Sequence, residues 1–252
     1  MSENDSHEKE KSRDELISTI RNYAHRAEHG SAVVKQSLDR RSSRTGIAAG
    51  KATKAARKVK LYNHLKGVPD ILAEDLACIF IGINPGVQTS KRGHHYAGPG
   101  NLFWPLLYES HCVNEKVTYE LDTILPSKYQ LGLTNLVDRP TAQASELSDQ
   151  EMLDAVQTLE SKIKRFQPKS VCFVGKSIWL AVYTVISGDK QSKRIRTPDN
   201  FEWGWQPQLL ASTPVYVVPS TSGRVAAYSR AQKLEMWLPL GQFITSHRSS
   251  ND

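Results

Sequence analysis

Three polar segments each follow a short apolar run, and their side chains are suited to orienting a bound group. Residues 82–86 (Gly-Ile-Asn-Pro-Gly) form a tight turn that holds Asn84 and leaves backbone N–H groups open to a ligand. Residues 134–141 (Thr-Asn-Leu-Val-Asp-Arg-Pro-Thr) and 219–224 (Pro-Ser-Thr-Ser-Gly-Arg) are also polar. An amide cannot act as a general base as a carboxylate can, so Asn84 would contribute by orientation.

Each segment alone has an ordinary interpretation as well. Turns of this kind are common between a strand and a helix, and an asparagine there caps the turn about as often as it touches a substrate. The segment 219–224 suits contact with a phosphate backbone or insertion into a groove, but serine-rich turns are frequent. The case for a site therefore depends on all the segments together.

The elements that must position these segments are short buried strands. Continuous apolar runs, typical of parallel strands covered on both faces, occur at residues 76–82, 131–137, 170–174 and 214–218. Helix-like segments lie between them, so we predict a three-layer α/β/α sandwich with a central, mainly parallel four-stranded sheet. In such folds ligands bind outside the carboxyl ends of the strands, which is where the polar segments fall.

Three helices are clearest in the sequence. One begins at Ser148, which has capping-box spacing to Glu151 and precedes an apolar face formed by Met152, Leu153, Val156, Leu159 and Ile163. A second is predicted from Lys176 to Ile186 and a last from Tyr228 to Leu238. An amphipathic pattern also spans residues 14–28, and its partner is not evident from the sequence.

The positive charge of the chain is concentrated in one segment. The net charge is +7, and residues 31–60 carry nine basic and one acidic side chain, among few large apolar residues. We predict an extended, disordered basic arm that neutralises phosphates and gives DNA affinity that falls with salt. The alternative is a solvated tail or nuclear-import signal without DNA contact.

Composition excludes several classes of protein. No apolar run approaches the roughly 20 residues of a membrane span, and the first thirty residues do not have the apolar stretch of a signal peptide, so we expect a protein that stays inside the cell and does not contact membranes. The three cysteines, Cys78, Cys112 and Cys172, are far apart and are interpreted as small hydrophobes in a reduced core. Their number excludes a four-cysteine iron–sulfur cluster.

Two motifs resemble other kinds of site. Gly175-Lys176-Ser177 follows a strand like the end of a phosphate-binding loop, but Ser170 stands where the first glycine is required, so Lys176 is interpreted as a DNA-facing residue. His94 and His95 are adjacent and therefore have poor geometry for a shared metal. We expect neither a metal site nor a cofactor.

Taken in order, the segments closely resemble the mismatch-specific uracil and thymine DNA glycosylases, a branch of the uracil-DNA glycosylase superfamily. The motifs that carry the resemblance are residues 82–86, residues 93–104 (Gly-His-His-Tyr-Ala-Gly-Pro-Gly-Asn-Leu-Phe-Trp), residues 134–139 and residues 219–224. The similarity extends over about residues 72–240. We accordingly divide the chain into an N-terminal extension (1–60), a catalytic domain (61–243) and a C-terminal tail (244–252).

The resemblance implies roles for individual residues. Asn84 matches the catalytic asparagine that positions the attacking water at C1′, and Thr141 matches a residue that helps to hold that water. The substrate-binding positions that it implies are Ile83, whose backbone faces the base, His95, Tyr96, Asn101 and Asn135. The implied DNA-binding positions are Lys176, Ser220, Thr221, Ser222, Gly223 and Arg224, of which Ser220 contacts phosphate and Arg224 fills the space left by the flipped nucleotide.

The function implied is base-excision repair of uracil mispaired with guanine in double-stranded DNA, by base flipping and hydrolysis to an abasic site. Thymine is also implied, although residues 87–92 depart from the small-residue pattern of thymine-active members. We expect a nuclear monomer whose product passes to downstream abasic-site repair enzymes.

Two alternatives remain open from the sequence. A catalytically weak mismatch-binding or chromatin adaptor with the same fold would bind mispairs without releasing base. A bifunctional glycosylase would cut the strand through a lysine Schiff base, for which Lys176 is the candidate.

Overall fold

The computed structural model describes residues 18, 62, 64–188 and 193–248. The basic arm and nearly all of the 14–28 pattern lie outside these residues, so the predictions made for them stay predictions. The chain divides into two units, residues 1–57 and 58–252, and the second carries the fold described below.

The second unit is built around a five-stranded sheet with the order β2-β1-β3-β5-β4. Four strands are parallel and correspond to the four predicted runs: β1 (Cys78–Gly82), β2 (Leu131–Asn135), β3 (Val171–Val174) and β5 (Val215–Val218). The fifth, β4 (Gly204–Trp205), pairs antiparallel with β5. The predicted mainly parallel sheet is confirmed, but the number of four strands was wrong because a two-residue strand leaves no pattern in the sequence.

The two outermost parallel strands, β2 and β5, each have a backbone partner on their outer side. β4 covers the outer side of β5 through the pairs Gly204 with Val217 and Trp205 with Tyr216. On the outer side of β2, Ile71 and Leu133 exchange two backbone hydrogen bonds of 2.8 and 2.9 Å. The four parallel strands are therefore flanked at both edges by short antiparallel partners.

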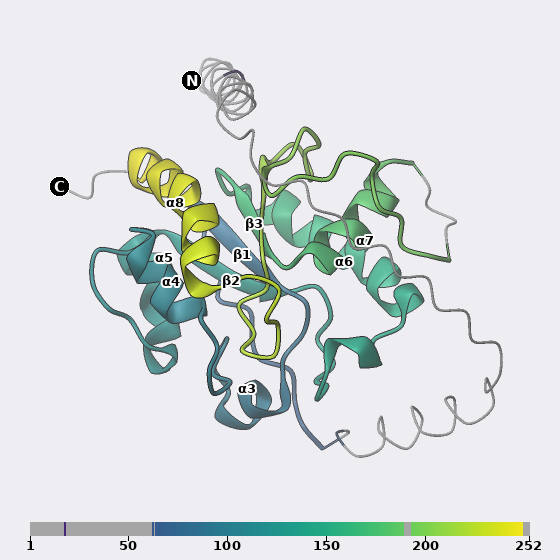
Figure 1. The fold of residues 1–252 in the computed structure, drawn as a ribbon, viewed down its shortest axis with the longest axis horizontal. Helices are drawn as coiled ribbons and strands as arrows, with labels where there is room; N and C mark the ends of the chain where they lie inside the picture. The colour runs from purple at the N-terminus through teal and green to yellow at the C-terminus, as the bar shows by residue number, and fades with distance from the viewer. Residues whose placement is uncertain (1–17, 19–61, 63, 189–192, 249–252) are drawn as a thin grey trace. The chain divides into compact units, whose positions relative to one another are not determined.

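Helices cover both faces of the sheet (Figure 1). On one side lie α6 (Asp149–Phe166) and α7 (Lys176–Ile186), and on the other α4 (Phe103–Glu109), α5 (Leu125–Tyr129) and α8 (Arg230–His247). The remaining elements are α3 (Val87–Arg92) and two 3₁₀ helices, η1 (Tyr119–Ile124) and η2 (Ala144–Glu146). The predicted three-layer architecture is confirmed.

The alternation of side chains along β1 feeds both layers of the core. Ile79 and Ile81 are fully buried in the cluster that contains α6 and α7. Phe80 points to the other face, where its ring stacks on Trp237 of α8 at 5.6 Å and meets Phe103 of α4 edge-on at 5.4 Å. A strand buried on both faces is thus held by aliphatic packing on one side and by aromatic packing on the other.

The predicted helices at Ser148 and Lys176 are present. Ser148 is the N-cap of α6, and its hydroxyl accepts a hydrogen bond of 3.1 Å from the backbone N–H of Glu151. α8 differs from the prediction because it continues beyond Leu238 and contains Pro239. The residues after this proline include Leu240 and Ile244, which are fully buried, so tertiary packing outweighs the helix-breaking tendency of proline. The boundary placed after residue 243 falls within this helix.

The three cysteines are buried and unpaired, as predicted. Burial is the main cause that raises the pKa of Cys112 to about 12, so its thiol stays protonated at neutral pH. Within the described part of the chain, no helix is both long and apolar enough to cross a membrane.

Candidate active site

The carboxyl ends of β1 and β2 hold two of the predicted segments side by side. Gly82 and Asn135 are direct partners in the parallel ladder. Backbone pairing continues beyond the strands, since Leu136 donates to the Gly82 carbonyl and Val137 to the Ile83 carbonyl, each at 2.9 Å. The backbone of Ile83 is therefore fixed next to the segment that carries Asn135.

The Asn84 amide is held by the loop that follows β2. Its Nδ2 donates to the Arg139 carbonyl at 2.7 Å and to Thr141 Oγ1 at 2.8 Å. A carbonyl oxygen can only accept, so the amide atom facing Arg139 must be the nitrogen and the orientation of the amide is fixed. Thr141 is itself buried and donates its backbone N–H to the Pro85 carbonyl at 3.1 Å.

This arrangement determines what Asn84 can do chemically. Both hydrogens of its amide nitrogen are used, and Oδ1 remains as an acceptor that no described residue engages. The Thr141 hydroxyl accepts from Asn84 and keeps its own hydrogen for another acceptor. A water molecule that donates to Oδ1 would be oriented by a rigid amide, without any transfer of its proton to Asn84.

Asn135 and Tyr96 meet over Gly82. A Cβ atom added to Gly82 would lie 2.5 Å from Asn135 Oδ1 and 3.1 Å from the Tyr96 hydroxyl, so both side chains occupy the space next to this glycine. The Tyr96 hydroxyl is buried without a hydrogen-bond partner among the described residues, and its ring stacks on Phe103 at 3.8 Å. Burial raises the pKa of Tyr96, so the phenol is neutral and can donate.

The backbone of Tyr96 adopts an unusual conformation. Its φ of 53° lies in the left-handed region, which costs about 1 kcal/mol for a residue with a side chain. Strain of this kind persists only where the surrounding structure compensates for it, and it often marks functional sites. Here the compensation includes the stacking of Tyr96 on Phe103, and the Tyr96 hydroxyl lies next to Gly82 at the end of β1.

His95 is buried beside Tyr96 and has a fixed orientation. Its ring Nε2 lies 2.9 Å from the Pro69 carbonyl and therefore carries a hydrogen, and its backbone N–H donates to Asp122 Oδ2 at 2.9 Å. Burial is the largest cause that lowers the pKa of His95, so the ring is neutral at pH 7 and presents Nδ1 as an acceptor. This histidine is a fixed dipole next to Tyr96, with 6.3 Å between the centres of the two rings.

His94 and His95 are both held by Asp122. His94 Nδ1 lies 2.9 Å from Asp122 Oδ1, so the buried Asp122 carboxylate holds the side chain of one histidine and the backbone of the other. Across residues 64–188 and 193–248, no three His, Cys, Asp or Glu side chains are grouped in a way that could hold a metal ion.

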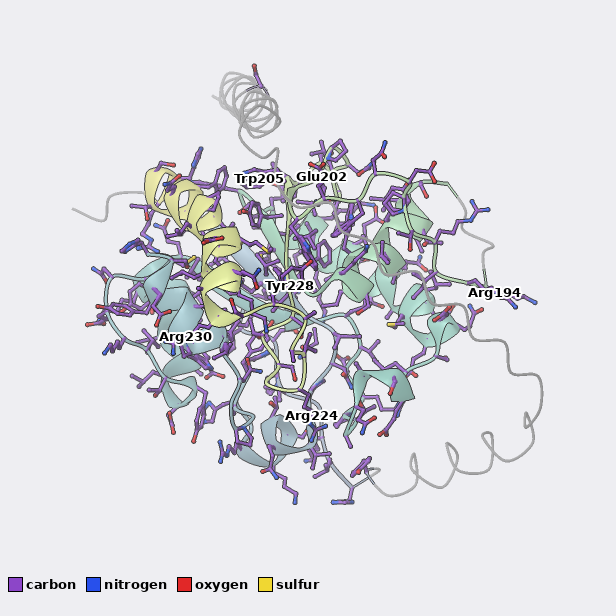
Figure 2. The ribbon with its side chains drawn as sticks, viewed as in Figure 1. Arg194, Glu202, Trp205, Arg224, Tyr228 and Arg230 are labelled. Atoms are coloured by element: carbon purple, nitrogen blue, oxygen red, sulfur yellow. The ribbon has the colours of Figure 1, made fainter. Side chains whose placement is uncertain are left out.

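The loop after β5 packs against two of the other segments. The Thr221 carbonyl accepts from the Leu102 N–H at 2.9 Å, and a Cβ atom on Gly223 would lie only 2.7 Å from the Gly100 carbonyl oxygen. Arg224 is exposed on this loop (Figure 2), and its guanidinium contacts the Ala142 carbonyl, next to Thr141. The loop is therefore joined both to the segment before α4 and to the segment after β2.

Serine hydroxyls shape the same loop from within. Ser220 Oγ accepts from the Ser222 N–H at 3.4 Å, and Ser222 Oγ accepts from the Arg224 N–H at 3.3 Å. These two local bonds curl the backbone so that Arg224 projects from its end.

Asn101 and Lys176 have local partners in the structure. Asn101 Oδ1 accepts from the Phe103 N–H at 3.0 Å at the start of α4. Lys176 lies at the first position of α7, with Nζ 4.2 Å from the centre of the Phe201 ring. The substrate contact predicted for Asn101 and the DNA contact predicted for Lys176 stay predictions.

The structure thus brings the predicted residues of all the loops to one edge of the sheet. The family model described as the Uracil DNA glycosylase superfamily matches residues 69–241, which include every one of these positions. The chain belongs to this superfamily. Within it, the chain is 37% identical over 187 residues to a G/U mismatch-specific uracil DNA glycosylase of Schizosaccharomyces pombe.

That similarity covers 73% of this chain and 55% of the relative, so the chain spans about half the length of the curated relative that it matches. The solution NMR structure of a protein from Methanosarcina acetivorans, described as a candidate uracil DNA glycosylase, is also similar. It is 20% identical with a TM-score of 0.47, over 71% of this chain and 98% of that one.

Two features of this superfamily domain were missed from the sequence. Gly82 was assigned to the end of a strand and to a turn, but its lack of a side chain is also what makes room for Asn135 and Tyr96. Arg139 was present in the motif without a role, and the structure places its carbonyl on the Asn84 amide. Such contacts, 55 residues apart in the chain, leave no local pattern.

Proposed function

We propose that this protein is a DNA glycosylase that hydrolyses the N-glycosidic bond of uracil mispaired with guanine. The observation that carries the proposal is the immobilised Asn84 amide, whose Oδ1 is not engaged by any described residue and which follows the strand end where Gly82 pairs with Asn135. The relative from S. pombe is named as an enzyme of this specificity, and its identity of 37% supports the same substrate class here.

The chemistry follows from the donors and acceptors available. The bond between C1′ and the base nitrogen breaks with its electron pair going to the base, and the sugar acquires oxocarbenium character. Asn84 Oδ1 accepts a hydrogen bond from a water molecule and so aims the water oxygen at C1′. As that oxygen bonds to C1′, one proton of the water is lost to solvent and the other stays on the new hydroxyl group. Asn135 and the backbone at Ile83 stabilise the negative charge on the departing uracil.

A base inside a duplex cannot reach this site until it is extruded. Unstacking costs a few kcal/mol and costs least at a mispair, so a G·U pair is favoured before the base is recognised. Arg224, which projects from the loop after β5, fills the gap in the duplex, and Ser220 contacts the adjacent phosphate. Slow release of the abasic product is the expected consequence.

The proposal is tested with purified protein in excess over a G·U duplex, followed by alkaline cleavage of the abasic strand. We expect complete conversion in a single turnover without added metal. Tight binding of the mispair without release of uracil would instead indicate a binding adaptor, and a covalent adduct trapped by borohydride would indicate a lysine nucleophile.

Gly82 gives a prediction on the specificity of the site. Gly82→Ala places a methyl group only 2.5 Å from Asn135 Oδ1, and the amide must swing away because the backbone of the strand cannot move. We expect the single-turnover rate on G·U to fall by about 100-fold, with thermal stability nearly unchanged, because base recognition depends on the position of the amide.

The matched control is Gly86→Ala, in the same turn, where an added Cβ would have no atom within 4 Å. Gly86 has a φ of −74°, which alanine adopts without strain. If Gly82→Ala and Gly86→Ala release uracil at the same single-turnover rate, the Asn135 amide does not take part in recognition of the base.

We further propose that thymine opposite guanine is a poorer substrate than uracil. Residues 87–92 form α3 directly after the Asn84 turn. They are not the small residues that would leave room for the methyl group of thymine. Parallel single-turnover rates on G·U and G·T duplexes test this order. Equal rates would contradict it.

The basic arm is proposed to supply affinity that is independent of sequence. Deleting residues 1–58 is expected to flatten the salt dependence of DNA binding and to leave single-turnover release within about tenfold. An unchanged slope of binding against salt would exclude the arm from DNA contact. We also propose that the protein acts as a nuclear monomer and passes abasic DNA to downstream repair enzymes, which a fluorescent fusion and light scattering would test.

A further inference from the structure

The orientation of the Asn84 amide depends on a side chain that does not touch it. The Arg139 carbonyl takes one of the two hydrogens of Asn84 Nδ2, at 2.7 Å. The other acceptor, Thr141, is held separately through the bond of its backbone to Pro85. The position of the Arg139 carbonyl is therefore a distinct requirement for aiming Oδ1 outward.

The side chain of Arg139 anchors that carbonyl to α6. Its Nε and Nη2 donate to the two carboxylate oxygens of Glu151 at 2.7 and 2.8 Å, which is the bidentate geometry that an arginine and a carboxylate form best. Nη2 also donates to the Glu146 carbonyl at 3.2 Å. Glu151 is fixed in turn, because its backbone N–H is bound by the Ser148 side chain at the start of α6.

The charges of this pair neutralise each other. The hydrogen bond from Arg139 is the largest cause that lowers the pKa of Glu151, which therefore stays ionised at neutral pH. Both side chains are about 30% exposed, so the pair is partly shielded from salt. An arginine whose donors are used in this way is poorly placed to bind a phosphate.

We propose that Arg139 and Glu151 are positioning residues for the reaction, and that their ion pair transmits the fixed position of α6 through the Arg139 carbonyl to the Asn84 amide. This inference rests on the proposed function, because it concerns the water that Asn84 would orient. It assigns the pair to the chemical step and not to the binding of DNA.

The test is the double variant Arg139→Met/Glu151→Met, which keeps the net charge. We expect the single-turnover rate on a G·U duplex to fall by about 30-fold, since misplacement of a catalytic group by an ångström costs up to about 100-fold. Affinity for a duplex with 2′-fluorinated deoxyuridine opposite guanine, whose glycosidic bond resists hydrolysis, should stay within about twofold. Arg139→Lys, which retains charge but not the bidentate geometry, should lie between the double variant and the wild type.

The matched control is Glu160→Met/Lys164→Met, which removes an ion pair of 2.8 Å near the other end of α6. Its rate should equal that of the wild type. The inference is overturned if the wild type releases uracil and the Arg139/Glu151 variant does so as fast, if the control pair loses as much, or if the loss appears as weaker binding.

Failure of the proposed function would look different, since the wild type itself would then release no uracil. Should the double variant unfold, Glu151→Gln and Arg139→Lys decide the matter, because each retains part of the hydrogen bonding. Thermal unfolding of every variant identifies that case. A wild-type rate in both single variants would overturn the inference.

Discussion

Asn84→Ala is expected to lower single-turnover release of uracil from a G·U duplex by about 1000-fold while leaving affinity for the duplex nearly unchanged. The variant removes Oδ1, the one atom of the side chain that is free to orient water, and with it the two hydrogen bonds of Nδ2. The two loops remain joined by backbone hydrogen bonds from Thr141 to Pro85 and from Val137 to Ile83. Rates with enzyme in excess and affinities for the 2′-fluorinated duplex separate the two effects.

The control for this prediction is Asn114→Ala, the same change at an exposed position between α4 and η1. It should behave as the wild type does. Thr141→Val is an informative intermediate, because it removes one acceptor of the Asn84 amide and keeps the other. If Asn84→Ala releases uracil at a rate near that of the wild type, the site and the mechanism proposed for it are both wrong.

Gly241→Ala is expected to give the largest loss of stability. A Cβ atom at this position of α8 would lie 1.6 Å from the Ser110 carbonyl oxygen and 2.8 Å from its carbon, and these are backbone atoms that a rotamer change cannot move. The gain in helix propensity is smaller than the clash. We expect a net destabilisation of about 3 kcal/mol, and a fall of roughly 10 °C in the unfolding midpoint.

Thermal and urea unfolding measure this effect, and Gln242→Ala, at the next and exposed position of α8, is the control. Its midpoint should change little. An unaltered midpoint in Gly241→Ala would mean that α8 can move away from the end of α4 without cost. The stacking of Trp237 on Phe80, which depends on the same docking, makes that outcome unexpected.

What the sequence predicts well is what depends on local pattern. The strands β1, β2, β3 and β5 are apolar runs, and the N-cap at Ser148 is a hydrogen bond between residues three apart. β4 has two residues and exists through its pairing with β5, so no pattern marked it. The extension of α8 beyond Pro239 depends on the burial of Ile244, which is likewise a property of the assembled core.

The candidate site divides in the same way. Roles could be predicted for Asn84, Asn135 and Arg224 because each lies in a sequence motif that resembles the family. The space over Gly82 and the bond from Asn84 to Arg139 join segments more than fifty residues apart in the chain, and only folding brings them together. The chemical type of each site residue could therefore be predicted from the sequence. The contacts that fix the orientation of these side chains could not.

The short antiparallel segments at the two edges of the parallel strands affect the tendency of the protein to aggregate. A parallel strand with an open flank is a template on which a second chain can add a strand and begin aggregation. Here Ile71 and β4 occupy those flanks, each through a very short pairing. We therefore expect that aggregation on heating begins when the pairing at Ile71 or at β4 frays, at a lower temperature than the one at which the interior of the sheet unfolds.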